Sequence, residues 1–126
     1  MSDSWPGCEI RELPDGGREF ILAEPKLSFI RIDMQTRLQF GEAQLEIECP
    51  FTLTTGVDSF HLDPNDRHAL GPLVGLYPDE IIRMTMRHDG TLDALFASGS
   101  ALTVSPHPKY EAWNVGGFWC PPGGFG

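Results

Sequence analysis

Histidines and carboxylates are the groups in this chain that could carry acid–base or metal chemistry. His61 lies two residues before Asp63, and His68 lies two residues after Asp66. An imidazole beside a carboxylate is typical of proton transfer or metal ligation. However, no H-E-x-x-H, H-x-H or C-x-x-C pattern is present, so the spacing matches no familiar ligand set. We therefore predict no catalytic residue, metal or cofactor, and we expect Asp63, which precedes Pro64, to cap a helix.

The thiols and serines do not form a recognisable nucleophilic site. Three cysteines, Cys8, Cys49 and Cys120, lie far apart, and such an odd, sparse count favours reduced thiols. Cys120 has no positive neighbour that would lower its pKa, so a buried thiol is the favoured interpretation. No G-x-S-x-G pattern occurs, and the glycine-rich end lacks the Lys-Ser/Thr of a phosphate-binding loop. The sequence therefore favours a protein without enzymatic activity.

Residues 107–126, HPKYEAWNVGGFWCPPGGFG, concentrate aromatic side chains among glycines and prolines. Aromatic residues of this kind either anchor a partner or close one end of a core. Tyr110 and Trp113 are three residues apart, which suits one helical turn. We predict a structural role for Trp113, and for Tyr110 both interpretations stay open. The candidates for binding a partner or ligand are Tyr110, Glu111, Phe118, Trp119 and Phe125.

Two segments, 29–51 and 81–107, resemble each other weakly. Each begins with Ile-Arg in an alternating run and continues through turns to a third apolar strand that ends at a proline. Alternation of period two with glycine-containing turns is typical of antiparallel hairpins with one buried face. The Asp-Gly pair ending at Gly90 is the clearest hairpin turn, so Gly90 has a predicted structural role. We expect two three-stranded β-meanders, and an internal duplication stays open.

A short helical crossover is expected between the meanders, within residues 63–77. Its apolar spacing predicts a short helix near 64–70 and a second turn or 3₁₀ segment at 72–76, interrupted at Gly71-Pro72. The predicted fold is α+β, mostly β, in a single domain of residues 1–126 that ends in the aromatic segment 108–126. The meanders would form a sandwich or an open, strongly curved barrel.

The charge of the chain limits the classes of partner that it can bind. Its formal net charge is −9, and its nine Lys and Arg residues form no stripe. Nucleic-acid and anionic membrane partners are therefore disfavoured, whereas a basic protein partner fits. The first residues carry no positive and apolar pattern of a signal peptide, and no apolar run approaches about 18 residues. We therefore expect a cytoplasmic location.

A family resemblance rests on short motifs in a fixed order. They are DGTL at 89–92, a Phe and Gly pair at Phe96 and Gly99, YEAW at 110–113 and PGG at 122–124. This pattern resembles a family of small bacterial proteins, frequent in actinobacteria, that is described as a domain of unknown function. The resemblance covers about three quarters of the chain and leaves the first 25 residues or so unplaced. It implies a shared fold and no particular activity.

Three hypotheses follow. The first is an interaction domain that binds a protein partner through an acidic, partly aromatic surface, as immunity or accessory proteins do. The alternative is a small-ligand-binding domain or enzyme with a pocket between the sheet and the 64–76 helix, with Tyr110, Glu111 and His107 at its mouth. The third, compatible with both, is a homo-oligomer that pairs exposed edge strands.

Overall fold

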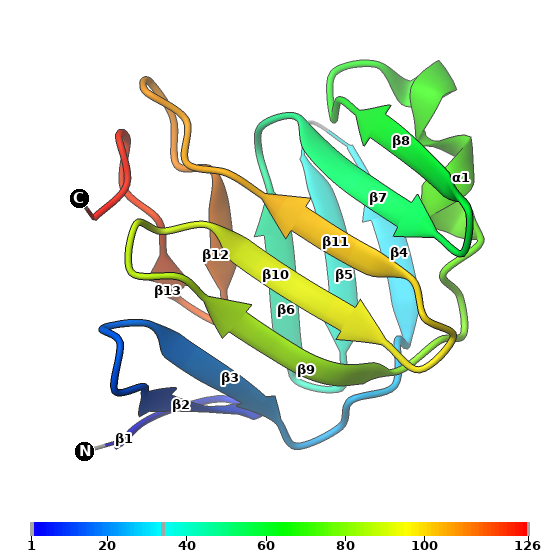
Figure 1. Ribbon diagram of the computed structural model, residues 1–126. Helices are drawn as coiled ribbons and strands as arrows, with labels where there is room; N and C mark the ends of the chain where they lie inside the picture. Colours follow the sequence, from blue (N-terminus) through cyan, green and yellow to red (C-terminus); the bar gives the residue numbers. More distant parts are fainter. Residues whose placement is uncertain (1, 34, 126) are drawn as a thin grey trace.

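The structure, a computed structural model, describes residues 2–33 and 35–125. Two antiparallel sheets pack face to face and do not close into a barrel (Figure 1). In spatial order, the larger sheet contains β1 (Ser2–Trp5), β2 (Cys8–Glu12), β3 (Arg18–Leu22), β9 (Ile81–Met86), β10 (Leu92–Phe96), β11 (Ala101–Val104), β7 (Phe51–Thr55) and β8 (Asp58–Leu62). The smaller contains β13 (Phe118–Trp119), β12 (Trp113–Val115), β6 (Ala43–Ile47), β5 (Thr36–Phe40) and β4 (Phe29–Ile32).

The predicted mostly-β sandwich is confirmed, and each predicted meander lies within one sheet. Strands β4, β5 and β6 form the first meander in the smaller sheet, and β9, β10 and β11 form the second in the larger. Alternate residues of β5 and β6 are fully buried between the sheets. This period-two pattern is what one apolar face against a second sheet requires.

Three further groups of strands extend the sheets beyond the predicted meanders. Strands β1 to β3 add one edge to the larger sheet, and β7 with β8 adds the other. Strands β12 and β13 extend the smaller sheet from β6. The N-terminal segment that the family resemblance left unplaced contains β1 to β3 and so belongs to the larger sheet.

The crossover is shorter and later than the spacing indicated. A 3₁₀ helix spans Arg67–Leu70, and α1 spans Gly71–Val74, so Gly71-Pro72 begins the α-helical turn instead of interrupting the helix. Proline is tolerated there because the first N–H groups of a helix have no intrahelical acceptor. The Asp63 carboxylate accepts the Asn65 N–H at 2.9 Å, which closes a turn and leaves the helix without a side-chain cap.

One apolar core lies between the sheets. Its largest fully buried side chains include Trp113, Phe40, Phe51 and Phe96, which come from both sheets. Leu70, Leu73 and Leu76 of the crossover join the same core, whereas Val74 and Tyr77, which share the apolar spacing, are exposed. In the described residues, no helix is both long and apolar enough to cross a bilayer.

Candidate functional site

The C-terminal segment forms a hairpin instead of the helical turn suggested by the Tyr110 and Trp113 spacing. Residues 108–110 are bends, and β12 begins at Trp113. Gly116 and Gly117, with φ of +62° and +122°, connect β12 to β13 in a two-residue turn. Positive φ at both central residues is the geometry of tight hairpin turns and favours glycine. The hairpin places successive aromatic side chains on opposite faces of the smaller sheet.

Trp113 and Phe118 point into the core side of this hairpin. Trp113 is fully buried, meets Phe20 edge-on at 5.8 Å between ring centroids, and donates its Nε1–H to the Gly90 carbonyl at 2.8 Å. Phe118 stacks on Trp113 and, on its other side, on Phe125. The guanidinium of Arg18 lies 5.1 Å from the Phe118 ring centre. Phe118 therefore links the core to the exposed Phe125.

The final residues hold the turn between β9 and β10. The Phe125 N–H donates to the Asp89 carbonyl at 3.2 Å, and the Gly123 N–H donates to the His107 carbonyl at 2.8 Å. A Cβ on Gly124 would lie 2.3 Å from the Asp89 carbonyl oxygen, so this close approach requires glycine. Gly90, in the turn itself, lies under Cys120 and Phe125. This part of the segment thus seals the open end of the sandwich.

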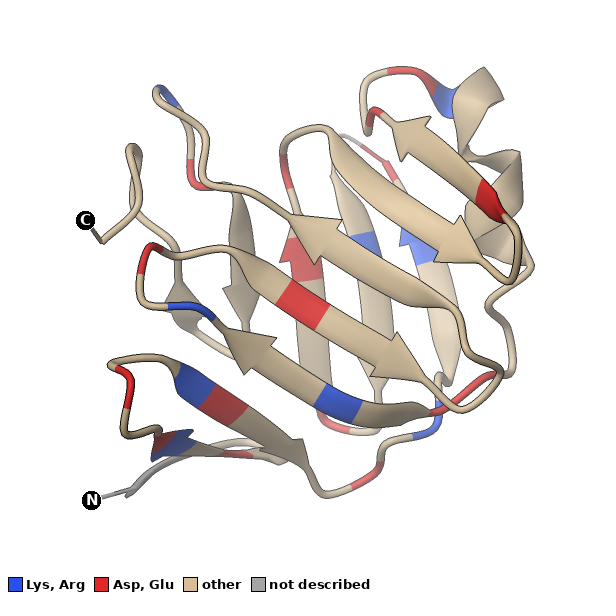
Figure 2. Cartoon of the chain, in the orientation of Figure 1, with Lys and Arg blue, Asp and Glu red and all other residues tan. Residues whose placement is uncertain are grey.

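Trp119 occupies the opposite, outward face of the hairpin. It is 44% exposed and pairs with Asn114 of β12, which in turn pairs with Glu46 of β6. The strand register continues this row of outward-facing side chains across all five strands of the smaller sheet. Figure 2 shows the charged members of the row on β6, β5 and β4. The row consists of Trp119, Asn114, Glu46, Arg37 and Arg31. Arg37 Nε lies 3.4 Å from Glu46 Oε1, so part of the Glu46 charge is already paired.

A polar cavity lies on this face and includes Asn114 and Glu46 of the row among its walls. Its volume is about 280 Å³, and its walls are Pro6, Glu42, Gln44, Glu46, Asn114, Gly116 and Gly117. Carboxylate and amide oxygens can accept hydrogen bonds from an ammonium or guanidinium group. The Trp5 ring packs against Gly117, where an added Cβ would lie 3.0 Å from it. We name the set of Trp5, Trp119, Glu42, Glu46 and Asn114 the acidic aromatic patch.

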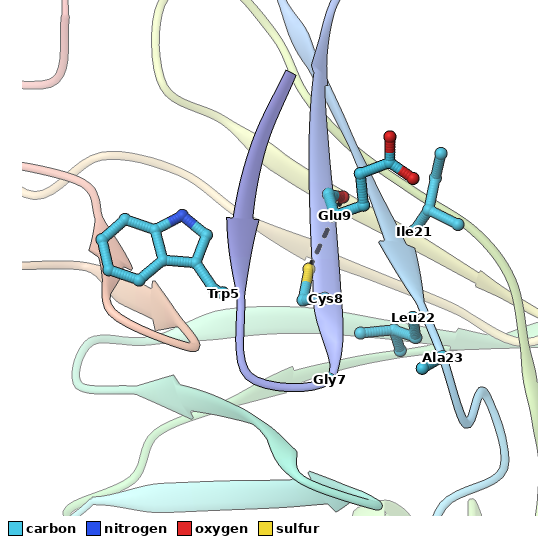
Figure 3. A pocket seen from close by; sticks show the side chains of 7 residues that line it. All are labelled: Trp5, Gly7, Cys8, Glu9, Ile21, Leu22 and Ala23. Carbon is cyan, nitrogen blue, oxygen red and sulfur yellow. Dashed lines mark hydrogen bonds between the residues drawn. The ribbon is translucent and has the colours of Figure 1, made fainter.

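A second cavity is lined by residues of β1, β2 and β3 and of the turn between β1 and β2 (Figure 3). Its volume is about 300 Å³, and Cys8, Glu9, Ile21 and Leu22 are among its lining residues. In Figure 3 the Trp5 indole points away from Glu9 and Ile21, toward the C-terminal hairpin. Cys8 Sγ contacts the Glu9 carbonyl oxygen at 3.7 Å, and burial raises the pKa of the Cys8 thiol to about 11. A protonated thiol is a poor nucleophile, so this cavity offers no evident chemistry.

The three thiols are expected to resist alkylation in the folded protein. Burial raises the pKa of Cys8, Cys49 and Cys120 alike to about 11, and all three are buried and free. At pH 7.5 roughly one such thiol in three thousand is ionised. Iodoacetamide labelling followed by intact mass should therefore be far slower in buffer than in urea. Rapid labelling of one cysteine in buffer would identify a reactive thiol and contradict this expectation.

The histidines do not assemble with the carboxylates beside them in sequence. His61, His68 and His88 are exposed, and within residues 2–33 and 35–125 no three His, Cys, Asp or Glu side chains gather as a metal site. His107 instead contacts Tyr110, with ring centroids 4.8 Å apart. The backbone N–H groups of Gln35 and Thr91 lower the pKa of Asp33 and Asp89, respectively, which is ordinary turn chemistry.

The predicted binding residues therefore divide among three places. Trp119 belongs to the acidic aromatic patch. Phe118 and Phe125 stack on each other at the end of the sandwich that the C-terminal residues cover. Tyr110, which is exposed, and Glu111, which is half-buried, lie in the loop before β12. Sequence reasoning missed the other members of the patch, which are Asn114, the strand partner of Trp119, and Trp5, Glu42 and Glu46. The alternation of Gln44 and Glu46 with buried residues marked their outward face, but nothing local linked β6 to β12.

The cavities beside α1 do not have the mouth that the alternative hypothesis predicted. One, of about 410 Å³, is lined by Thr55, Phe60, Pro72, Gly75, Leu76, Ser98 and Ser100. The other, of about 520 Å³, lies between α1 and β4. His107, Tyr110 and Glu111 line neither, because their loop lies at the end of the sandwich remote from α1 (Figure 1).

Comparison with known proteins matches this chain to a family model. No curated protein and no solved structure matches this chain. The match is to a family model, which begins within β3 and continues almost to the end of the aromatic segment. Strands β1 and β2, with Trp5 and Cys8, therefore precede the matched part. Over residues 21–124, the chain belongs to the family of unknown function DUF6188.

Proposed function

We propose that this protein is a non-enzymatic interaction domain that binds a basic surface of a protein partner through the acidic aromatic patch. The observation that carries the proposal is the half-exposed Trp119 on an outer sheet face, one strand from Asn114 and two from Glu46. Indole rings contribute large apolar area to interfaces and are frequent among the residues that dominate binding energy. Core closure does not account for this side chain, since Trp113 and Phe118 fill the inner face.

The charge of the patch supports a cationic partner group. Glu42 is exposed and Glu46 half-buried, and both line the cavity of about 280 Å³. A lysine or arginine side chain inserted there would meet two carboxylates and the amides of Gln44 and Asn114. The net charge of −9 would also speed encounter with a basic surface. Neutralisation of a basic toxin active site, as immunity proteins do, is one form of this function, by class analogy alone.

Affinity capture from an extract of its own cells tests the proposal. The immobilised 126-residue chain is expected to retain a specific protein at low salt and to release it at high salt. Trp119→Ala and Glu42→Lys are each expected to weaken binding of the identified and purified partner by about 2 kcal/mol, or roughly thirty-fold, in titration calorimetry. Both side chains lie outside the core, so circular dichroism should show both variants folded.

Asp58→Lys is the matched control for charge. It makes the same charge change as Glu42→Lys, but at the start of β8 in the other sheet, where Asp58 is exposed. Equal weakening by Asp58→Lys and Glu42→Lys would mean that only net charge matters and would count against a defined patch. A partner whose affinity is unchanged by Trp119→Ala would exclude the patch as its binding site.

A further inference from the structure

Strand β4 is the terminal strand of the smaller sheet, at the edge opposite β13. It pairs with β5 on one side, and no strand of the described residues covers the other. The Asp33 N–H donates to the Gln35 carbonyl at 3.1 Å, so Asp33 and Gln35 form a hydrogen-bonded pair. Arg31 and Arg37, each two residues further along its strand, therefore form the next hydrogen-bonded pair. Because hydrogen-bonded and non-hydrogen-bonded pairs alternate, Ile30 and Ile32 direct their N–H and C=O groups to the free side. This edge therefore offers four backbone groups to a further strand.

An apolar groove accompanies this free edge. A cavity of about 520 Å³ separates β4 from α1 and the residues after it, and it is lined by Ser28, Phe29, Ile30, Ile32, Val74 and Tyr77. Phe29, Val74 and Tyr77 are 51%, 58% and 55% exposed, respectively. Soluble proteins usually blunt or cover such edges. A strand lying along β4 would place alternate side chains in the groove, where they would bury these surfaces.

The outer face of β4 indicates the charge of that strand. Arg31 points outward beside Arg37, and it is 3.1 Å from the Asp33 carboxylate. A second copy of β4 could pair antiparallel with both Ile30 and Ile32 only if a two-fold axis passed beside Arg31. That register would set two Arg31 side chains directly opposite each other, which is unfavourable. An acidic residue in the added strand would instead oppose Arg31 favourably, so charge complementarity favours a heterologous segment over a second copy.

We propose that an extended segment of a protein partner adds to β4 as a sixth strand of the smaller sheet. Its signature is two apolar residues separated by one acidic residue. The apolar pair exchanges backbone hydrogen bonds with Ile30 and Ile32 and fills the groove beside Val74 and Tyr77, while the acidic side chain faces Arg31. This site lies at the sheet edge remote from Trp119 and is independent of the acidic aromatic patch.

A defined peptide tests this site directly. The probe is the capped, fluorescein-labelled peptide Ser-Gln-Ile-Glu-Ile-Gln-Ser, titrated with the full chain and followed by fluorescence anisotropy. Saturable binding is expected, and a peptide with Lys in place of Glu should bind about ten-fold more weakly. With Arg31→Glu this preference should reverse. Methylation of both isoleucine nitrogens should abolish binding, because it removes the donors that strand pairing needs.

Two surface variants locate the peptide on the molecule. Val74→Asp is expected to weaken binding about ten-fold by placing a charge in the groove. Ile82→Asp makes a similar change at an exposed position of β9 in the other sheet and should leave binding unchanged. Absence of saturable binding up to about 1 mM peptide would overturn the proposal. So would equal binding of the methylated peptide, or sedimentation showing a dimer that Val74→Asp dissociates, since a second copy would then cover the groove.

Discussion

Trp113→Ala is expected to lower the free energy of unfolding by about 4 kcal/mol. The indole is fully buried, and it packs between Phe20 and Phe118. Its removal leaves a cavity at the end of the core and deprives the buried Gly90 of the hydrogen bond donated by Nε1. The free energy of unfolding of a domain of this size is only about 5–15 kcal/mol, so the variant would lose a large share of its stability. Urea unfolding followed by far-ultraviolet circular dichroism gives the free energy without relying on tryptophan fluorescence.

Trp119→Ala is the matched control, because it removes the same side chain from the outer face of the same hairpin. Trp119 is half-exposed, so we expect a loss below about 1 kcal/mol. Trp113→Phe separates the two contributions to the larger effect, since it keeps aromatic packing but loses the N–H donor. Its expected cost is about 1–3 kcal/mol, the range for an unpaired buried polar group. Equal destabilisation by Trp113→Ala and Trp119→Ala would make the whole hairpin structural and remove the binding role proposed for Trp119.

The meanders could be predicted because their signal is local. In β5 and β6 every second residue is buried, and the Gly41 and Gly90 turns separate strands that pair with their sequence neighbours. The short strands β12 and β13, of three and two residues, are too brief for any period to appear. Strand β8 has mostly exposed residues, as an edge strand can, so its alternation was weak. The Tyr110 and Trp113 spacing was misleading because only Trp113 turns inward.

The candidate site could be predicted only in part, for a related reason. Trp119 was identifiable as an aromatic residue beyond the needs of a small core. Glu46 and Trp5 lie more than 70 residues away from Trp119 in sequence. The β6–β12 pairing and the packing of Trp5 on Gly117 bring them to the same hairpin. Such pairings depend on which strands become neighbours in the folded sheet, and one sequence contains no local record of that choice. The acidic aromatic patch therefore required the fold.

Gly90→Ala is expected to cost about 2–5 kcal/mol of unfolding free energy. Gly90 has φ of +103°, and an L-residue at positive φ costs about 1–2 kcal/mol. A Cβ there would also lie 3.1 Å from Cys120 Sγ, 3.2 Å from the Phe125 ring and 3.3 Å from Pro106. Relieving such contacts in a packed region typically adds about 1–3 kcal/mol. The free energy can be measured by urea unfolding under the conditions used for the tryptophan variants.

Gly99→Ala separates the backbone cost from the packing cost. Gly99 occupies the next hairpin turn of the same meander with φ of +94°, but no atom lies within 4 Å of its added Cβ. The expected loss is therefore only the backbone contribution of about 1–2 kcal/mol. The difference between the two alanine variants measures how tightly the C-terminal segment packs on the β9–β10 turn. Equal losses would mean that Cys120 and Phe125 yield without cost, so that the segment would cover the core only loosely and Phe125 would be available to a partner.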